Sequence, residues 1–176
     1  MKLPLYYYNH PILRKQSTPV GKITDDIRQL CFDMIESMLA YKGIGLAAPQ
    51  VGHLLRIFVS NVDFEDEKGE IHLGEPVVFI NPILSNPSDV FVEREEGCLS
   101  IPGLYEFVKR PSKITVEAKN LEGNSFKKEC YGYHARNIMH ENDHLNGTLF
   151  IDRIKGKRRT LIEPKLLEIK QKYFQK

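Results

Sequence analysis

One segment of this 176-residue chain, His140-Glu141-Asn142-Asp143-His144, constrains its fold and its chemistry more than any other. Residues four apart share one face of an α-helix, so the two histidines present their imidazoles to the same point. Glu141 lies beside them, where its carboxylate can reach a water molecule without ligating a metal itself. Two nitrogen ligands and a general base are parts of a catalytic metal site. The alternative is a surface helix that carries two histidines by chance.

The residues around this segment also predict a helix. Ala135, Ile138 and Leu145 recur at helical spacing and form an apolar stripe. The pair Asn146-Gly147 predicts the end of the helix, because glycine readily adopts the left-handed conformation found there.

A catalytic metal also needs a third protein ligand, with one position left open. Downstream of the histidines, Asp152 and Glu163 are candidates, but no surrounding pattern selects either of them. Upstream, Cys98 follows a glycine and precedes a Ser-Ile-Pro-Gly sequence, which predicts a shaped loop that can aim a thiolate into a site. A thiolate with two neutral imidazoles leaves a divalent metal with one net positive charge, so it can still acidify water.

A second unusual segment is GIGLAAPQ at residues 43–50, with two glycines and two alanines. Small residues let the backbone approach another group closely. The segment is not a phosphate-binding loop, because it lacks the Gly-Lys-Ser/Thr ending. Two interpretations remain, a tight turn against the core and a wall that faces a ligand.

The apolar periodicity elsewhere predicts an α+β fold. A helix capped by Thr24 ends at Gly43, and Cys31 lies on its apolar stripe. We expect strands at residues 55–62, 76–82 and 89–94, a solvated acidic excursion at 63–76, and a hairpin at 113–131 with Cys130 in its second strand. The strands precede the histidine helix and are joined mostly by turns. This order favours mixed or antiparallel sheets packed around a central metal-binding helix.

Charge is distributed unevenly along the chain. The net charge of +2 gives no indication of DNA binding. Residues 155–176, however, hold eight basic and two acidic side chains, a net of +6, which leaves −4 for residues 1–154. Pro164 and the leucines after it predict a basic amphipathic helix at about 161–176, with the proline at its start. An ordinary solvated charged face is the simplest interpretation.

Cysteine content and hydropathy indicate the cellular compartment. Three widely spaced cysteines argue against a disulfide framework and for a reducing compartment. The N-terminus has no apolar signal region, and no run of 18 apolar residues could cross a membrane. We therefore expect a cytoplasmic protein without a membrane partner, folded as a single catalytic domain over residues 1–176.

Three segments together resemble the motifs of the bacterial peptide deformylases, in the same order along the chain. They are residues 43–50, Glu96-Gly97-Cys98-Leu99-Ser100, and the histidine segment at 140–144. The likeness runs from Pro11-Ile12-Leu13-Arg14 to Phe150-Ile151-Asp152-Arg153. Three spaced motifs are far more specific than one H-E-x-x-H.

The resemblance implies a metal-dependent hydrolase and a ligand set. Cys98, His140 and His144 would hold one divalent ion per chain, with Fe(II) expected and Zn, Ni or Co as substitutes. Glu141 would take a proton from the attacking water and pass it to the leaving amine. The reaction is removal of the N-formyl group from the formyl-methionine of new polypeptides, which releases formate.

The same resemblance implies roles for residues around the metal. Gln50 and the backbone N–H of Leu99 would stabilise the oxyanion formed from the formyl carbonyl. Ile44 and Gly45 would line the substrate cleft.

Glu96, two residues before Cys98, could brace the loop that aims the thiolate, and a solvated surface carboxylate is the alternative for it. Because formylated chains emerge at the ribosome, the basic tail could also contact ribosomal RNA phosphate.

Two other functions are compatible with the histidine segment. A metallopeptidase would need a downstream third ligand and a cleft open on both sides of the scissile bond. A binding module with a structural metal would need a fourth protein ligand and a closed site.

Overall fold

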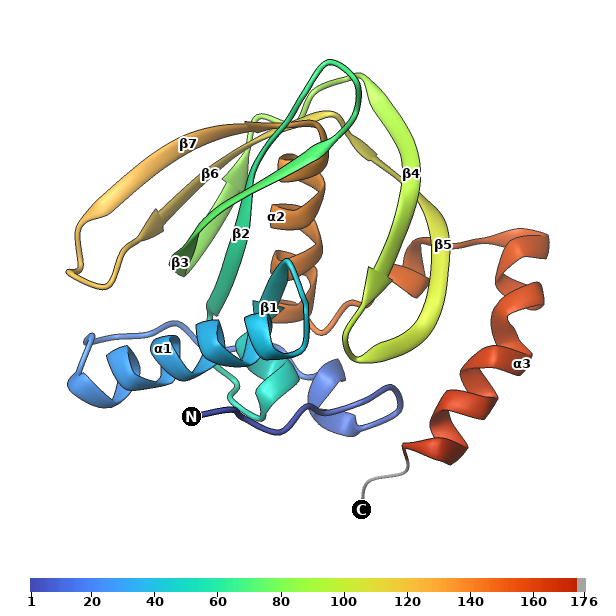
Figure 1. Cartoon of the computed structure of the whole chain (residues 1–176), viewed down its shortest axis with the longest axis horizontal. Coiled ribbons are helices and arrows are strands. Elements are labelled where there is room, and N and C mark those ends of the chain that lie inside the picture. Colours follow the sequence, from blue (N-terminus) through green and yellow to red (C-terminus); the bar gives the residue numbers. More distant parts are fainter. Residues whose placement is uncertain (174–176) are drawn as a thin grey trace.

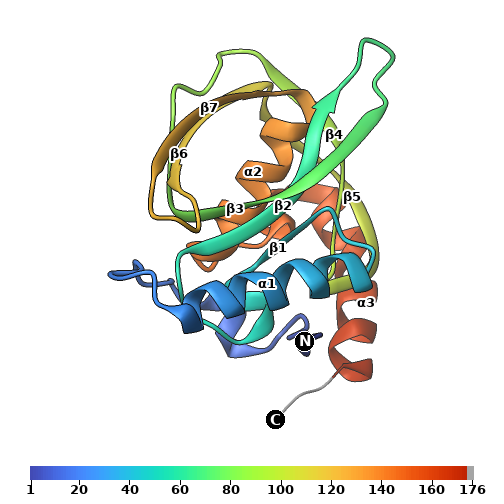
Figure 2. The same cartoon turned by 60° about the vertical axis from the view of Figure 1, so that its left-hand side comes forward.

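A computed structural model describes residues 1–173, and in it two antiparallel sheets surround the helix that carries the two histidines (Figures 1 and 2). This helix, α2, spans Gly132–Leu145. The larger sheet has the strand order β1-β2-β3-β6-β7, with bounds Gly45–Ala47, Ile57–Glu65, Ile71–Ser85, Lys113–Lys119 and Ser125–Tyr131. The smaller sheet pairs β4 (Phe91–Cys98) with β5 (Ile101–Pro111). The predicted α+β fold is confirmed.

Helix α2 is held by its apolar stripe. Ala135, Ile138 and Leu145 are fully buried and belong to one core cluster with Phe58 and other side chains of the larger sheet. Truncation of Ile138 or Leu145 to alanine would be expected to cost about 2–5 kcal/mol. The helix ends as predicted, with Gly147 just beyond it at φ 69°. The opposite face of α2 is therefore left to present polar side chains.

Helix α1 (Asp25–Ala40) begins as the sequence predicts. The Thr24 side chain accepts a hydrogen bond from the N–H of Ile27, which caps the first turn. Cys31 is fully buried in the core, and burial raises the pKa of its thiol to about 12. This thiol packs as an apolar group and does not ionise near neutral pH. Helix α1 packs against β1 and β2, so it supports the wall formed by residues 43–45 (Figure 2).

The hairpin at 113–131 is confirmed as β6 and β7. Residues 63–76 are mostly exposed, as expected of a solvated segment, but they form paired strands where an irregular excursion was expected. Strands β2 and β3 continue through most of this segment, with Val62 paired to Leu73 and Glu65 paired to Ile71. The acidic residues obscured this ladder in the sequence, because backbone hydrogen bonds do not depend on side-chain polarity. The strand expected at 89–94 also runs further, to Cys98.

The start of the C-terminal helix was predicted too late. Helix α3 spans Gly156–Lys172 and contains Pro164 in its interior, and the last three residues of the expected range lie outside the described residues. An interior proline costs about 3 kcal/mol. Burial of Ile162, Leu166 and Ile169 against the domain offsets this cost. The helix lies beside β5 at the edge of the molecule (Figure 1).

Candidate metal and catalytic site

Two elements bring three metal-binding side chains to one point. Helix α2 supplies His140 and His144, and Cys98 is the last residue of β4. One ligand atom from each of these residues lies within 4.8 Å of the others, and Cys98 Sγ is 3.3 Å from His144 Nε2. A soft thiolate with two imidazoles suits a divalent transition metal. The residues therefore fit a divalent metal ion.

The shaped loop expected around Cys98 is a tight β-turn. Leu99 and Ser100 join β4 to β5, and both ends of this turn are held by ladder pairing. The cysteine is thus fixed by a strand, which positions a ligand more rigidly than a free loop does.

Neither alternative third ligand joins this cluster. Asp152 forms a two-fold ion pair with Arg14, at 2.5 and 3.0 Å. Glu163 lies on α3, where it pairs with Arg159 at 2.7 Å. Among the residues that the structure describes, Cys98, His140 and His144 form the only group of this kind.

Glu141 is buried in the same cavity and has no partner for its Oε2 atom within residues 1–173. Burial raises the pKa of its carboxyl to about 7. A group with such a pKa can accept and return a proton near neutrality. Gly45 lies directly against this carboxylate, so a Cβ at residue 45 would collide with it. Of the two interpretations of residues 43–50, the wall that faces a ligand is the one supported.

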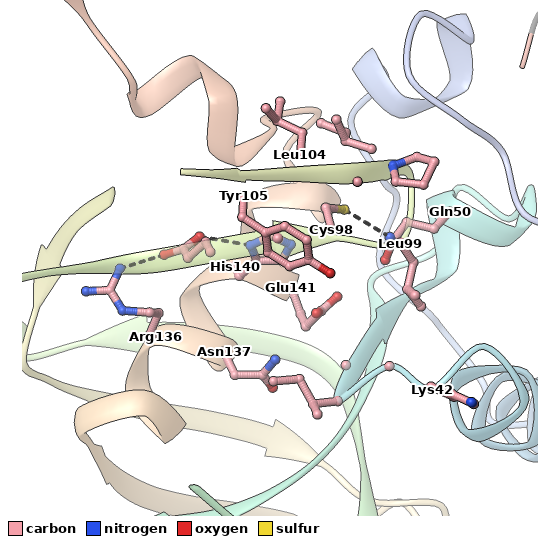
Figure 3. A pocket seen from close by; sticks show the side chains of 18 of the residues that line it. Lys42, Gln50, Cys98, Leu99, Leu104, Tyr105, Arg136, Asn137, His140 and Glu141 are labelled. Carbon is pink, nitrogen blue, oxygen red and sulfur yellow. Dashed lines mark hydrogen bonds and ion pairs between the residues drawn. The ribbon is translucent and has the colours of Figure 1, made fainter. Parts of the chain in front are cut away.

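Gln50 lies beside Cys98 and is 2% exposed. Its Oε1 accepts a hydrogen bond from the N–H of Ala47 at 2.8 Å, which fixes the orientation of the amide. Its Nε2 therefore faces the site, donating to Ser100 Oγ at 3.1 Å and lying 3.5 Å from Cys98 Sγ. Figure 3 shows Gln50 and Leu99 together beside the cysteine.

Glu96 is buried and is not a solvated carboxylate. It accepts hydrogen bonds from Arg110 at 2.6 and 2.9 Å and from Arg136 at 2.7 Å, and its Oε2 is 3.0 Å from His140 Nδ1. Burial alone would raise the pKa of Glu96, but the hydrogen bonds and charges of Arg110 and His140 hold it well below its usual range. Because Nδ1 of His140 is engaged by Glu96, Nε2 is the nitrogen left to bind a metal.

Sequence reasoning missed the two arginines in this network. Arg110 is 1% exposed and also donates to Asp143 on α2 at 2.9 Å. One signal was present, since Arg110 follows the buried Val108 by two residues and so shares its inward face. Arg110 lies on β5 and contacts Glu96 on β4 and Asp143 on α2, so its side chain links these three elements behind the ligands.

The cavity in front of these residues has a volume of about 370 Å³. Ile44 and Gly45 line one side of it, and Cys98, His140 and Glu141 lie at its base (Figure 3). Such a cavity can admit the end of a peptide chain.

Comparison with known proteins agrees over nearly the whole chain. Residues 2–160 match the family described as polypeptide deformylase. The peptide deformylase of Acinetobacter baumannii (strain SDF) is 43% identical over 95% of this chain and 91% of that protein. The peptide deformylase of Maricaulis maris (strain MCS10) is 40% identical over 92% of this chain and 90% of that protein.

Solved structures give the same result. The crystal structure of peptide deformylase from Ehrlichia chaffeensis has a TM-score of 0.88 and 36% identity, and the match covers 98% of both chains. The enzyme from Thermotoga maritima has a TM-score of 0.81 and 38% identity, over 89% of this chain and 99% of that one. Within residues 1–173, we find no helix with the length and apolar character needed to cross a membrane.

Proposed function

The chain belongs to the polypeptide deformylase family, and from this premise we propose the role of each of its site residues. The family activity is metal-dependent removal of the N-formyl group from new polypeptides. Three points go further: the residues that carry this reaction, the metal that serves it, and the place where the enzyme meets its substrate. The region that carries all of them is a single catalytic domain.

Cys98, His140 and His144 hold one divalent metal ion. The observation that carries this proposal is the convergence of their ligand atoms within 4.8 Å, beside a buried Glu141. A metal bound here supplies Lewis acidity, which generates a nucleophile from water at neutral pH and polarises the formyl carbonyl. Thiolate and imidazole ligands are compatible with Fe(II), which we take as the native metal, and with Zn, Ni or Co.

Glu141 moves the proton. Its carboxylate takes a proton from the attacking water and returns it to the departing nitrogen, so the peptide leaves with a neutral amine. The pKa of about 7 supports both halves of this transfer. Proton transfer of this kind typically contributes about 10²–10⁴-fold to a rate.

Gln50 and Leu99 stabilise the oxygen of the formyl group. The fixed amide of Gln50 directs its Nε2 donor into the cavity, and the backbone N–H of Leu99 lies in the turn just after Cys98. Each such donor contributes roughly 2.7–4 kcal/mol to stabilisation of a transition-state oxyanion. Ile44 and Gly45 hold the peptide against the opposite side of the cavity.

Glu96 orients His140. Its ionised carboxylate keeps the proton of the imidazole on Nδ1, which presents Nε2 to the metal. Arg110 and Arg136 in turn hold Glu96 in place.

The enzyme works in the cytoplasm, where new polypeptides emerge, and α3 contacts the ribosome. Three of the cations in α3 are already paired with carboxylates, namely Arg158, Arg159 and Lys165. No ion pair in residues 1–173 involves Lys155, Lys157 or Lys170, so these side chains are available to RNA phosphate.

Metal analysis tests the proposed site. Protein purified without oxygen should contain one metal per chain, and Cys98→Ala should contain almost none. Formate release from a formyl-methionyl peptide, compared with cleavage of an internal peptide bond, separates deformylation from peptidase activity. A fourth protein ligand, detected by metal spectroscopy, would favour a structural metal instead.

A further inference from the structure

The cavity has an open end that the reaction itself does not use. One wall is formed by residues 42–45, and the facing wall by the β4–β5 turn and the start of β5. The walls come close together, since a Cβ on Gly43 would lie 2.7 Å from Cδ1 of Leu99. Gly43 is therefore already in contact with Leu99, so a peptide must lie along this line of contact and cannot pass between the two residues.

The direction of this peptide follows from where the base lies. Gly45 contacts the carboxylate of Glu141, so the Gly45 end of the wall marks the reacting centre. Lys42 lies three residues earlier and away from His140 and Glu141 (Figure 3). An extended chain rises about 3.3 Å per residue, so three residues span at most roughly 10 Å. Lys42 is thus within reach of the second or third residue of a peptide whose formyl-methionine occupies the centre.

Lys42 is held at this position by its backbone. Its N–H donates to the carbonyl of Leu39 at 3.0 Å, and its φ of 59° lies in the left-handed region, which ends α1 sharply. The side chain is exposed, and no ion pair within residues 1–173 involves it. The backbone conformation therefore fixes the point from which the Lys42 side chain projects. Its ammonium group is available to a ligand.

Lys42 also sets the charge of the open end. The other charged residues that line the cavity are Glu96, Arg136, His140 and Glu141, all of which are buried. Glu96 is matched by Arg110 and Arg136. The facing wall ends in Tyr105, which is 64% exposed. Among the described residues that line the cavity, Lys42 is therefore the one exposed charged side chain.

We propose that Lys42 is a specificity-determining residue, which makes the enzyme prefer formyl-methionyl peptides with Asp or Glu at their second or third position. This inference rests on the proposed function, since it uses the same cavity. An exposed ion pair is weak, so the preference for an acidic over a basic side chain is about two- to fivefold. It decreases as salt rises, because exposed charges are screened.

The test uses the metal-loaded enzyme and amidated tripeptides that begin with formyl-methionine and carry Asp, Ser or Lys at the second or third position. Formate release gives kcat and KM for each peptide. We expect wild type to favour Asp over Lys through KM, Lys42→Gln to remove the difference and Lys42→Glu to reverse it. Lys22→Glu is the matched control, because Lys22 is an exposed lysine just before α1, at the opposite end of this 16-residue helix. This control should keep the wild-type ratio.

Two results would overturn the proposal: equal KM values for the Asp and Lys peptides in wild type, or a preference that survives Lys42→Glu. No formate from any peptide, the Ser peptide included, would contradict the proposed function instead. In that case the affinities of the same peptides for the wild-type and Lys42→Glu proteins, measured by calorimetry, still decide whether Lys42 selects acidic residues.

Discussion

The carboxylate of Glu96 lies 3.0 Å from Nδ1 of His140, and both side chains are buried. This contact joins β4, which ends in Cys98, to α2, which carries both histidines. A shift of either element would change the distance between the thiolate and the imidazoles. The pair therefore couples the geometry of the proposed metal site to the packing of the two sheets around α2.

Glu96→Ala should reduce metal affinity or activity by about 10–100-fold, because His140 loses the group that orients it. The change also leaves Arg110 without its main counter-charge, and breaking a buried pair in this way typically costs about 3–5 kcal/mol of folding stability. Metal content after dialysis and the midpoint of thermal unfolding measure the two effects. Glu96→Gln, which keeps the shape of the side chain, should be intermediate. Metal content and thermal unfolding identical to those of wild type would show that Glu96 does not orient His140.

The sequence predicted the elements that have strong local patterns. Helix α2 and the hairpin at 113–131 follow from an apolar stripe and from strict alternation. Strand β5 was missed, because Pro102 and Gly103 near its start interrupt any alternating pattern. Pro164 was wrongly interpreted as a helix start. The packing that holds this proline inside α3 is tertiary, so it leaves no local signal in the sequence.

The site residues also fall into two groups, those in local motifs and those that only the fold brings together. The histidines, Glu141 and Cys98 stand out because their motifs are local and resemble a known family. Arg110 and Arg136 reach Glu96 from positions 14 and 40 residues away, so the alternation that places Arg110 on an inward face gives no indication of its partner. Only the folded arrangement of two sheets around α2 shows that these buried charges are matched.

Removal of the metal should destabilise the fold. A ligand that binds the folded state at a concentration 100 times its Kd adds about 2.7 kcal/mol of stability. A chelator should therefore lower the unfolding midpoint of the metal-loaded wild type. The Cys98→Ala protein, without its thiolate ligand, should show little response. Equal shifts in the two proteins would place the stabilising metal elsewhere.

Acid should destabilise the protein through His134, which lies far from the ligands along α2. Its Nε2 is 3.7 Å from Cys130 Sγ, and burial, reinforced by the charge of Lys128, lowers the pKa of the imidazole to about 4 from the ordinary 6.5. A neutral folded-state histidine contributes stability that is complete above pH 6.5 and is lost as the pH falls towards 4. Thermal unfolding across this range should be less pH-dependent in His134→Gln. Equal slopes for the two proteins would show that His134 does not titrate on unfolding.

The basic helix should bind ribosomes through cations that have no carboxylate partner. Changing Lys155, Lys157 and Lys170 to Gln should weaken co-sedimentation with ribosomes, with a smaller dependence on salt than in wild type. Changing Arg159 and Lys165, which pair with Glu163 and Glu168, should have less effect. Sedimentation that is the same for all three proteins at every salt concentration would return α3 to a purely structural role.

Under the proposed roles, three residues hold the metal while Glu141 transfers the proton, and the Glu141→Ala protein tests this assignment most directly. Metal content and formate release should be measured on the same preparation. We predict one metal per chain, as in wild type, with formate release from a formyl-methionyl peptide reduced at least about 100-fold. A metal-free Glu141→Ala protein, or one that releases formate within tenfold of the wild-type rate, would contradict the account.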